Sequence, residues 1–76
     1  MKDLLIAIVK EMVDQPEQVS VNENSGSSTM VLELSVAKPD LGKVIGQKGK
    51  NITAIRTLMS AAGAKQKKRV IIELLE

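Results

Sequence analysis

Seventy-six residues form one domain at most, and a chain this short buries only roughly 60% of its unfolded surface. The absence of Cys and His excludes disulfides and typical zinc sites, and the absence of Phe, Tyr and Trp disfavours nucleic-acid readers that stack bases on aromatic rings. The net charge is only +2, and the longest apolar run, Leu4 to Val9, is far too short for a membrane span or a signal sequence, so we expect a soluble cytosolic protein.

The first predicted element is a helix over residues 3–14, which Asp3 caps and Pro16 terminates. Its apolar face follows the i, i+3, i+4, i+7 spacing and consists of Leu5, Ile8, Val9 and Met12. Three further apolar residues lie off this face and are either ordinary surface residues or part of a self-association patch: Leu4, Ile6 and Val13.

Two strands follow. Apolar and polar residues alternate over 19–22 and again over 30–36, and the polar segment 24–28 between them is rich in turn residues. These features predict an antiparallel hairpin. Pro39 cannot donate to a strand ladder, so the second strand is expected to end before it.

Two helices are predicted next. Asp40 is a candidate cap for a short helix over 41–45, and the tetrad 46–49 interrupts it. A longer helix begins at residue 50 or 51. Its predicted inner stripe is Ile52, Ile55, Leu58, Met59 and Ala62.

Gly63 is the expected C-cap of this longer helix, and a basic linker over 65–68 leads to a last strand over 70–74. The element order is therefore helix, strand, strand, helix, helix, strand. We expect an α+β fold in which a three-stranded sheet is covered on one face by three helices.

Charge is segregated along the chain. From Lys38 to Arg69 nine basic residues accompany a single acid, Asp40, which gives this segment a charge of +8; the remainder, with two lysines and eight acids, carries −6. The basic residues of the segment are Lys38, Lys43, Lys48, Lys50, Arg56, Lys65, Lys67, Lys68 and Arg69. Segregated charge directs an electric field, so a polyanionic partner is favoured over a merely solubilising surface.

The tetrad Gly46-Gln47-Lys48-Gly49 is the strongest candidate site. Each glycine allows backbone angles that a Cβ penalises and lets another backbone come close. Backbone amides at the start of the following helix, together with Lys48, suit a phosphate oxygen. The alternative interpretation is a plain tight turn between two helices.

Enzyme motifs are absent around this turn. Val44 stands where a P-loop or a dinucleotide-binding loop needs its first glycine, and Asn51 stands where a P-loop has Ser or Thr. Without His, Cys or clustered carboxylates near the turn there is no nucleophile–base pair. We therefore expect a non-enzyme with no catalytic residue, cofactor or metal.

The run Val44-Ile45-Gly46-Gln47-Lys48-Gly49-Lys50-Asn51-Ile52 resembles the signature of KH domains, in which a GxxG loop joins two helices. The element order is similar to the type II, prokaryotic arrangement. Over residues 1–76 the chain resembles a single KH domain of the small stand-alone bacterial type, the KhpA type. KH domains bind about four single-stranded nucleotides, with the GxxG loop clamping the backbone.

The resemblance implies a set of RNA-binding residues. The residues that would grip phosphates are Gly46, Gln47, Lys48 and Gly49. Those that would line a groove facing the bases are Leu41, Gly42, Val44 and Ile45, although one of the last two could face the core. Those that would add charge are Lys43, Lys50 and Arg56. The resemblance also implies a bacterial RNA chaperone or regulator that pairs with itself or with a second KH protein.

Two other functions stay open at this point. Residues 41–62 could form a helix-turn-helix that binds duplex DNA, with base readers chosen from Asn51, Thr53, Arg56 and Thr57. The chain could instead be a protein-interaction module whose groove is unused. The basic run 65–69 is either a solvated loop or an additional phosphate contact.

Overall fold

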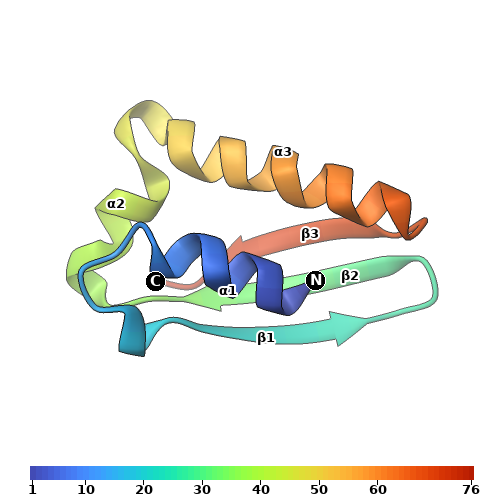
Figure 1. Ribbon diagram of the computed structural model, residues 1–76, viewed down its shortest axis with the longest axis horizontal. Coiled ribbons are helices and arrows are strands. Elements are labelled where there is room, and N and C mark those ends of the chain that lie inside the picture. Colours follow the sequence, from blue (N-terminus) through green and yellow to red (C-terminus); the bar gives the residue numbers. More distant parts are fainter.

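The computed structural model describes residues 1–76 and contains three helices and three strands in the predicted order, which confirms the α+β class (Figure 1). The elements are α1 (Lys2–Lys10), β1 (Ser20–Ser25), β2 (Thr29–Ser35), α2 (Leu41–Ile45), α3 (Lys50–Lys65) and β3 (Arg69–Leu74). Single-turn 3₁₀ segments precede β1 and α2, and a third connects α2 to α3. No helix combines the length and the apolar character that a membrane crossing requires.

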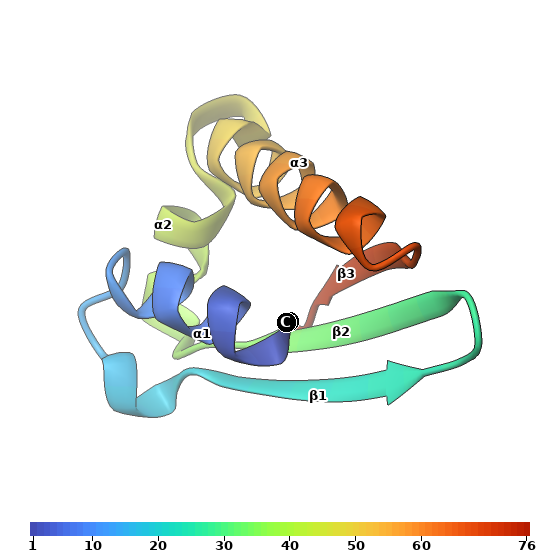
Figure 2. The ribbon, with the colours of Figure 1, turned by 45° about the vertical axis from the view of Figure 1, so that its right-hand side comes forward.

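The sheet has the strand order β1-β2-β3, with β1 antiparallel to β2 and β2 parallel to β3. Parallel neighbours require a crossover connection, and α2 and α3 provide it between β2 and β3. All three helices lie on the same face of the sheet (Figure 2), as predicted. The central strand β2 therefore buries alternate side chains, Met30, Leu32 and Leu34, beneath them.

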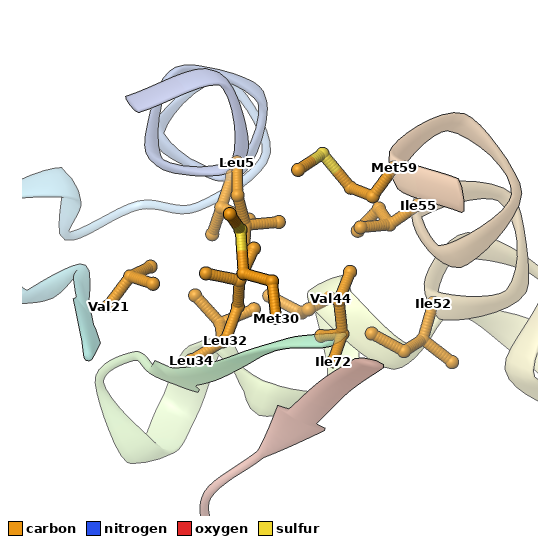
Figure 3. Packing of buried hydrophobic residues seen from close by; sticks show 11 residues of the cluster. Leu5, Val21, Met30, Leu32, Leu34, Val44, Ile52, Ile55, Met59 and Ile72 are labelled. Carbon is orange, nitrogen blue, oxygen red and sulfur yellow. The ribbon is translucent and has the colours of Figure 1, made fainter. Parts of the chain in front are cut away.

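The core is entirely aliphatic apart from its methionines, as the absence of aromatic residues requires. Its buried members are Leu5, Val9, Val21, Met30, Leu32, Leu34, Val44, Ile52, Ile55, Met59 and Ile72. Figure 3 shows Leu5 from α1 and Met59 from α3 converging above Leu32 of the central strand. Each helix thus contributes to one shared core, which fixes how α2 and α3 sit on the sheet.

Helix α1 is shorter than the predicted span 3–14: it ends at Lys10, four residues before the predicted end. Asp3 is not its N-cap: Met1 holds that position, and Asp3 lies in the first turn, where its charge complements the helix dipole. Ile6 and Val13 are half-buried against the core, so they do not form an exposed self-association patch. Leu4 remains 44% exposed.

Asp40 connects the segment after α1 to the start of α2. Its carboxylate is buried and accepts hydrogen bonds from the amides of Asp14 (3.2 Å) and Gln15 (3.0 Å). Asp40 holds the N-cap position of α2, as predicted, but its side chain makes no capping bond there because it binds these two amides.

Helix α3 also differs from its prediction. Ile52, Ile55 and Met59 are buried, but Leu58 is 57% exposed, because the buried stripe continues through Gly63 and leaves Leu58 at its side. Gly63 lies inside the helix and is not its C-cap. The left-handed residue beyond the helix is Lys67, with φ 56°.

The strands of the hairpin are longer or shifted relative to the predicted ranges. Strand β1 runs three residues beyond 22, into the segment predicted to be a turn, and β2 lies one residue earlier than 30–36. The pair Ser25–Met30 closes the hairpin register. Asparagine is depleted in strands, so the local sequence of residues 24 and 25 predicts a turn. These residues are nevertheless in β1 because they pair with Val31 and Met30 of β2.

Gly63 provides a test of the packing between α3 and β3. A Cβ on Gly63 would lie 2.5 Å from Val70 Cγ2 and 2.8 Å from the Lys68 carbonyl oxygen. We expect Gly63→Ala to lower the free energy of unfolding by about 1–3 kcal/mol, because a backbone oxygen cannot move aside cheaply.

Gly42→Ala is the matched control in urea denaturation of both variants. Gly42 is also helical, but nothing lies within 4 Å of its Cβ position. That variant is expected to be as stable as the parent or more stable by up to about 1 kcal/mol. Equal losses in the two variants would contradict the close α3–β3 contact.

Candidate nucleic-acid interface

The tetrad forms the turn between α2 and α3, and Gly46 is its tightest point. Gly46 has φ 77° and ψ 169°, a region that essentially only glycine occupies. A Cβ there would meet Asn51 Cγ at 2.6 Å and the Asn51 backbone nitrogen at 2.8 Å. Gly46 is therefore required both for its backbone angles and for the approach of α3.

Asn51 holds the two helices together from the other side of this contact. Its Nδ2 donates a hydrogen bond to the Lys43 carbonyl oxygen at 2.8 Å. The sequence pattern predicted Asn51 only as a candidate base reader, so this structural role was missed. The residue type could have indicated this role, because an Asn side chain near the start of a helix commonly forms hydrogen bonds with nearby backbone groups.

The middle of the tetrad is left-handed. Lys48 has φ 57° and ψ 26°, and Gly49 has φ 73° and ψ 16°. No atom lies within 4 Å of a Cβ on Gly49, so glycine is needed there for the left-handed backbone angles alone. The expectation that both glycines allow another backbone to come close therefore holds for Gly46 but not for Gly49. A lysine at positive φ is strained, and Lys48 is exposed.

The tetrad turn is closed by two backbone hydrogen bonds. The Gly49 amide donates to the Gly46 carbonyl at 3.1 Å, and the Lys50 amide donates to the Gln47 carbonyl. Both bonds lie within the turn that carries the exposed Lys48 side chain.

Helix α2 presents the expected groove residues unequally. Val44 is fully buried in the core, so the prediction that it contacts bases was wrong, whereas its neighbour Ile45 is 37% exposed. Leu41 is half-buried. Gly42 is exposed and has open space above it, so a ligand can approach the α2 backbone there.

Lys43 differs electrostatically from the other cations near the tetrad. Its Nζ lies 3.0 Å from Asp14 Oδ2, in the only ion pair of the structure. The hydrogen bond and the charge of Asp14 raise the pKa of Lys43 above its ordinary value, and the same carboxylate offsets part of its positive charge. Lys48 and Lys50 have no carboxylate partner, and their charge is fully available to an anion.

Arg56 lies apart from the tetrad. It is six residues beyond Lys50 on α3, which corresponds to roughly 9 Å along the helix. Its Nη2 donates to the Ile72 carbonyl oxygen of β3 at 3.4 Å. The structure therefore separates Arg56, which contacts the edge strand β3, from the other candidate residues, which lie within the continuous segment 41–50.

The different demands on the two glycines lead to a prediction. Gly46→Ala introduces both a clash with Asn51 and a forbidden backbone conformation, so we expect the free energy of unfolding to fall by about 2–4 kcal/mol. Gly49→Ala introduces only left-handed strain and should cost about 1–2 kcal/mol. Thermal and urea denaturation would measure both. A Gly49→Ala loss as large as that of Gly46→Ala would contradict this geometry.

Comparison with known proteins adds a family to this geometry. The family model described as KhpA/KhpB, KH domain matches residues 2–74. The chain is 47% identical over 76 residues to a protein of Chlamydia pneumoniae named RNA-binding protein KhpA, covering 100% of this chain and 97% of the relative. No solved structure matches the chain.

Proteins of the same name in other bacteria are similarly close. The chain is 49% identical over 75 residues to the one from Caldanaerobacter subterraneus subsp. tengcongensis, covering 99% of this chain and 100% of the relative. It is 41% identical over 76 residues to the one from Listeria monocytogenes, with both chains covered in full. These likenesses span the whole length that the fold occupies.

Proposed function

The chain belongs to the KhpA/KhpB family of KH domains, and we propose that residues 1–76 act as a single KH domain that binds single-stranded RNA. The observation that carries the proposal is the glycine turn between α2 and α3, which presents an exposed Lys48 that has no ion-pair partner. The names of the relatives agree with a binding protein rather than an enzyme. The residues proposed to bind RNA remain those predicted from the sequence, with Val44 removed because it is buried.

The proposed grip on the backbone has two components. Backbone amides of the tetrad turn donate hydrogen bonds to a phosphate oxygen, and the Lys48 ammonium adds a point charge beside it. Lys50 and Lys43 supply further positive charge, although Asp14 neutralises part of the latter. Contacts of this kind fix the position of the strand but carry no base information.

Base contacts fall to α2. Ile45 offers an exposed apolar side chain, and Gly42 leaves the helix backbone open to the flat face of a base. The chain has no aromatic residue on which a base could stack. We therefore expect weak selectivity among short RNA sequences, and an affinity that falls with added salt through counterion release.

Duplex DNA binding is the less favoured alternative. A recognition helix needs free side chains toward a major groove. Two of the candidate readers are occupied, since Asn51 bonds to Lys43 and the Thr57 hydroxyl donates to the Thr53 carbonyl at 3.0 Å. Competition between single-stranded RNA and duplex DNA at matched salt separates the functions, and tighter duplex binding would overturn the proposal.

We also propose that the chain pairs with itself or with another KH chain and works as a bacterial RNA chaperone or post-transcriptional regulator in the cytoplasm. Leu58, exposed on α3, supports the pairing, because the fold gives it no contact in the core. Pairing would raise affinity by linking two weak sites. Sedimentation of the parent and of Leu58→Asp tests it: a monomeric parent would rule out self-pairing.

The decisive variant for RNA binding carries Gln47→Asp and Lys48→Asp. Two carboxylates placed against the phosphate should weaken binding of a labelled oligonucleotide by at least about tenfold, because attraction becomes repulsion. Asp tolerates the left-handed angles of position 48, so the melting temperature should stay close to that of the parent. Fluorescence anisotropy and thermal denaturation would measure the two quantities.

A matched control has the same change of charge far from the tetrad. Lys10→Asp with Gln18→Asp alters two exposed residues of the α1–β1 region. This control is expected to lose much less affinity than the tetrad variant. If both variants lost affinity equally, net charge rather than the tetrad would explain binding.

A further inference from the structure

A second cluster of cations lies at the opposite end of α3 from the tetrad (Figure 1). We call it the basic turn, and its residues are Lys65, Lys67, Lys68 and Arg69. Helix α3 has 16 residues, so the two ends are separated by roughly 24 Å. The basic turn is therefore a separate surface, outside the site at residues 41–50.

The backbone of the basic turn is rigidly defined. The Lys68 amide donates to the Gly63 carbonyl at 2.9 Å, and the Lys67 amide donates to the Ala64 carbonyl at 3.0 Å. This pair of bonds is the Schellman termination, in which the left-handed residue is usually glycine. Here that residue is Lys67, with φ 56°.

The choice of lysine at this position is not explained by the fold. The side chain of Lys67 is exposed and makes no hydrogen bond or ion pair. Only two non-glycine residues in the chain have positive φ, and both are lysines: Lys48 in the tetrad and Lys67 in the basic turn. Strained residues without a structural benefit point to function.

The charge of the basic turn is uncompensated. None of its four cations lies within ion-pair distance of a carboxylate. The Arg69 amide donates to the Ser28 carbonyl of the adjoining hairpin loop at 2.8 Å. This loop between β1 and β2 contains only Gly and Ser, so it offers no carboxylate to the basic turn. The helix dipole accounts for Lys65 in the last turn of α3, but not for the lysines beyond it.

We propose that the basic turn is a second phosphate-binding surface, which contacts the RNA strand beyond the nucleotides held at the tetrad. The inference rests on the proposed function. The nucleotides held at the tetrad already occupy the site at residues 41–50, so only a longer strand can cover that site and the basic turn together. The second contact is then intramolecular and strengthens binding through effective concentration.

Lys67→Gly is the most discriminating variant, because it separates stability from binding. Glycine relieves the left-handed strain, so the melting temperature should rise by about 2–6 °C. Binding should be measured with labelled oligouridylates of 4 and 12 nucleotides. We expect Lys67→Gly combined with Lys65→Gln to leave binding of the 4-mer within about twofold of the parent and to weaken binding of the 12-mer by about 3- to 10-fold.

The salt dependence of 12-mer binding gives an independent readout. For a single strand, the slope of log affinity against log salt should become shallower by about 0.7 for every phosphate that the variant no longer binds. The matched control is Lys2→Gln with Lys10→Gln, which removes the same charge from α1. This control should bind both oligonucleotides as the parent does.

Three results would overturn the inference: unchanged 12-mer binding by the basic-turn variant, equal weakening of the 4-mer and the 12-mer, or equal weakening by the α1 control. A failure of the proposed function looks different. In that case the parent itself would bind neither oligonucleotide, or the Gln47→Asp, Lys48→Asp variant would bind both as tightly as the parent.

Discussion

The contact between Gly46 and Asn51 is the constraint on which the proposed RNA-binding surface depends. Asn51 occupies the space of a Gly46 side chain and bonds to the Lys43 carbonyl, so α3 begins directly against the end of α2. Val44 before the tetrad and Ile52 after it are buried in the same core. The tetrad is thus held at both ends by core residues, and Lys48 in its middle is exposed.

The distribution of charge around this surface is the second basis of the proposed function. Asp14 compensates Lys43, but the other cations near the tetrad and in the basic turn have no carboxylate beside them. The left-handed lysines stand at the two ends of α3, where they are strained and exposed. Neither lysine makes an ion pair that would stabilise the isolated domain. A polyanionic strand that runs from one end of α3 to the other would be attracted at both.

Much of the fold follows from local sequence patterns. Apolar periodicity predicted the order of helices and strands, and the tetrad marked the junction of α2 and α3. The errors arose where a distant residue decides. Asp40 bonds to amides 25 and 26 residues away, so its carboxylate makes no capping bond to α2 although Asp40 holds the N-cap position. Gly63 was predicted to be a C-cap because glycine commonly ends helices. Its actual role, a close contact of α3 with Val70 and the Lys68 carbonyl, is a tertiary feature that the local sequence does not show.

The candidate site was predictable to a similar extent. The spacing of the tetrad identified residues 41–50, but spacing alone could not tell which of Val44 and Ile45 faces the core. It also could not show that Asp14 pairs with Lys43, since the two residues are brought together only by the fold. The backbone angle of Lys67 has no sequence signature, because glycine is the residue expected there.

Amide chemical shifts during titration with a short oligouridylate test the RNA clamp most directly. The amides of Gln47 and Lys48 in the tetrad should show the largest changes, with smaller ones at Gly42 and Ile45 on α2. The uncovered face of the sheet, around Val31 and Ile71, should remain unperturbed. Largest changes on that face, or small changes spread evenly over the domain, would contradict binding at the tetrad.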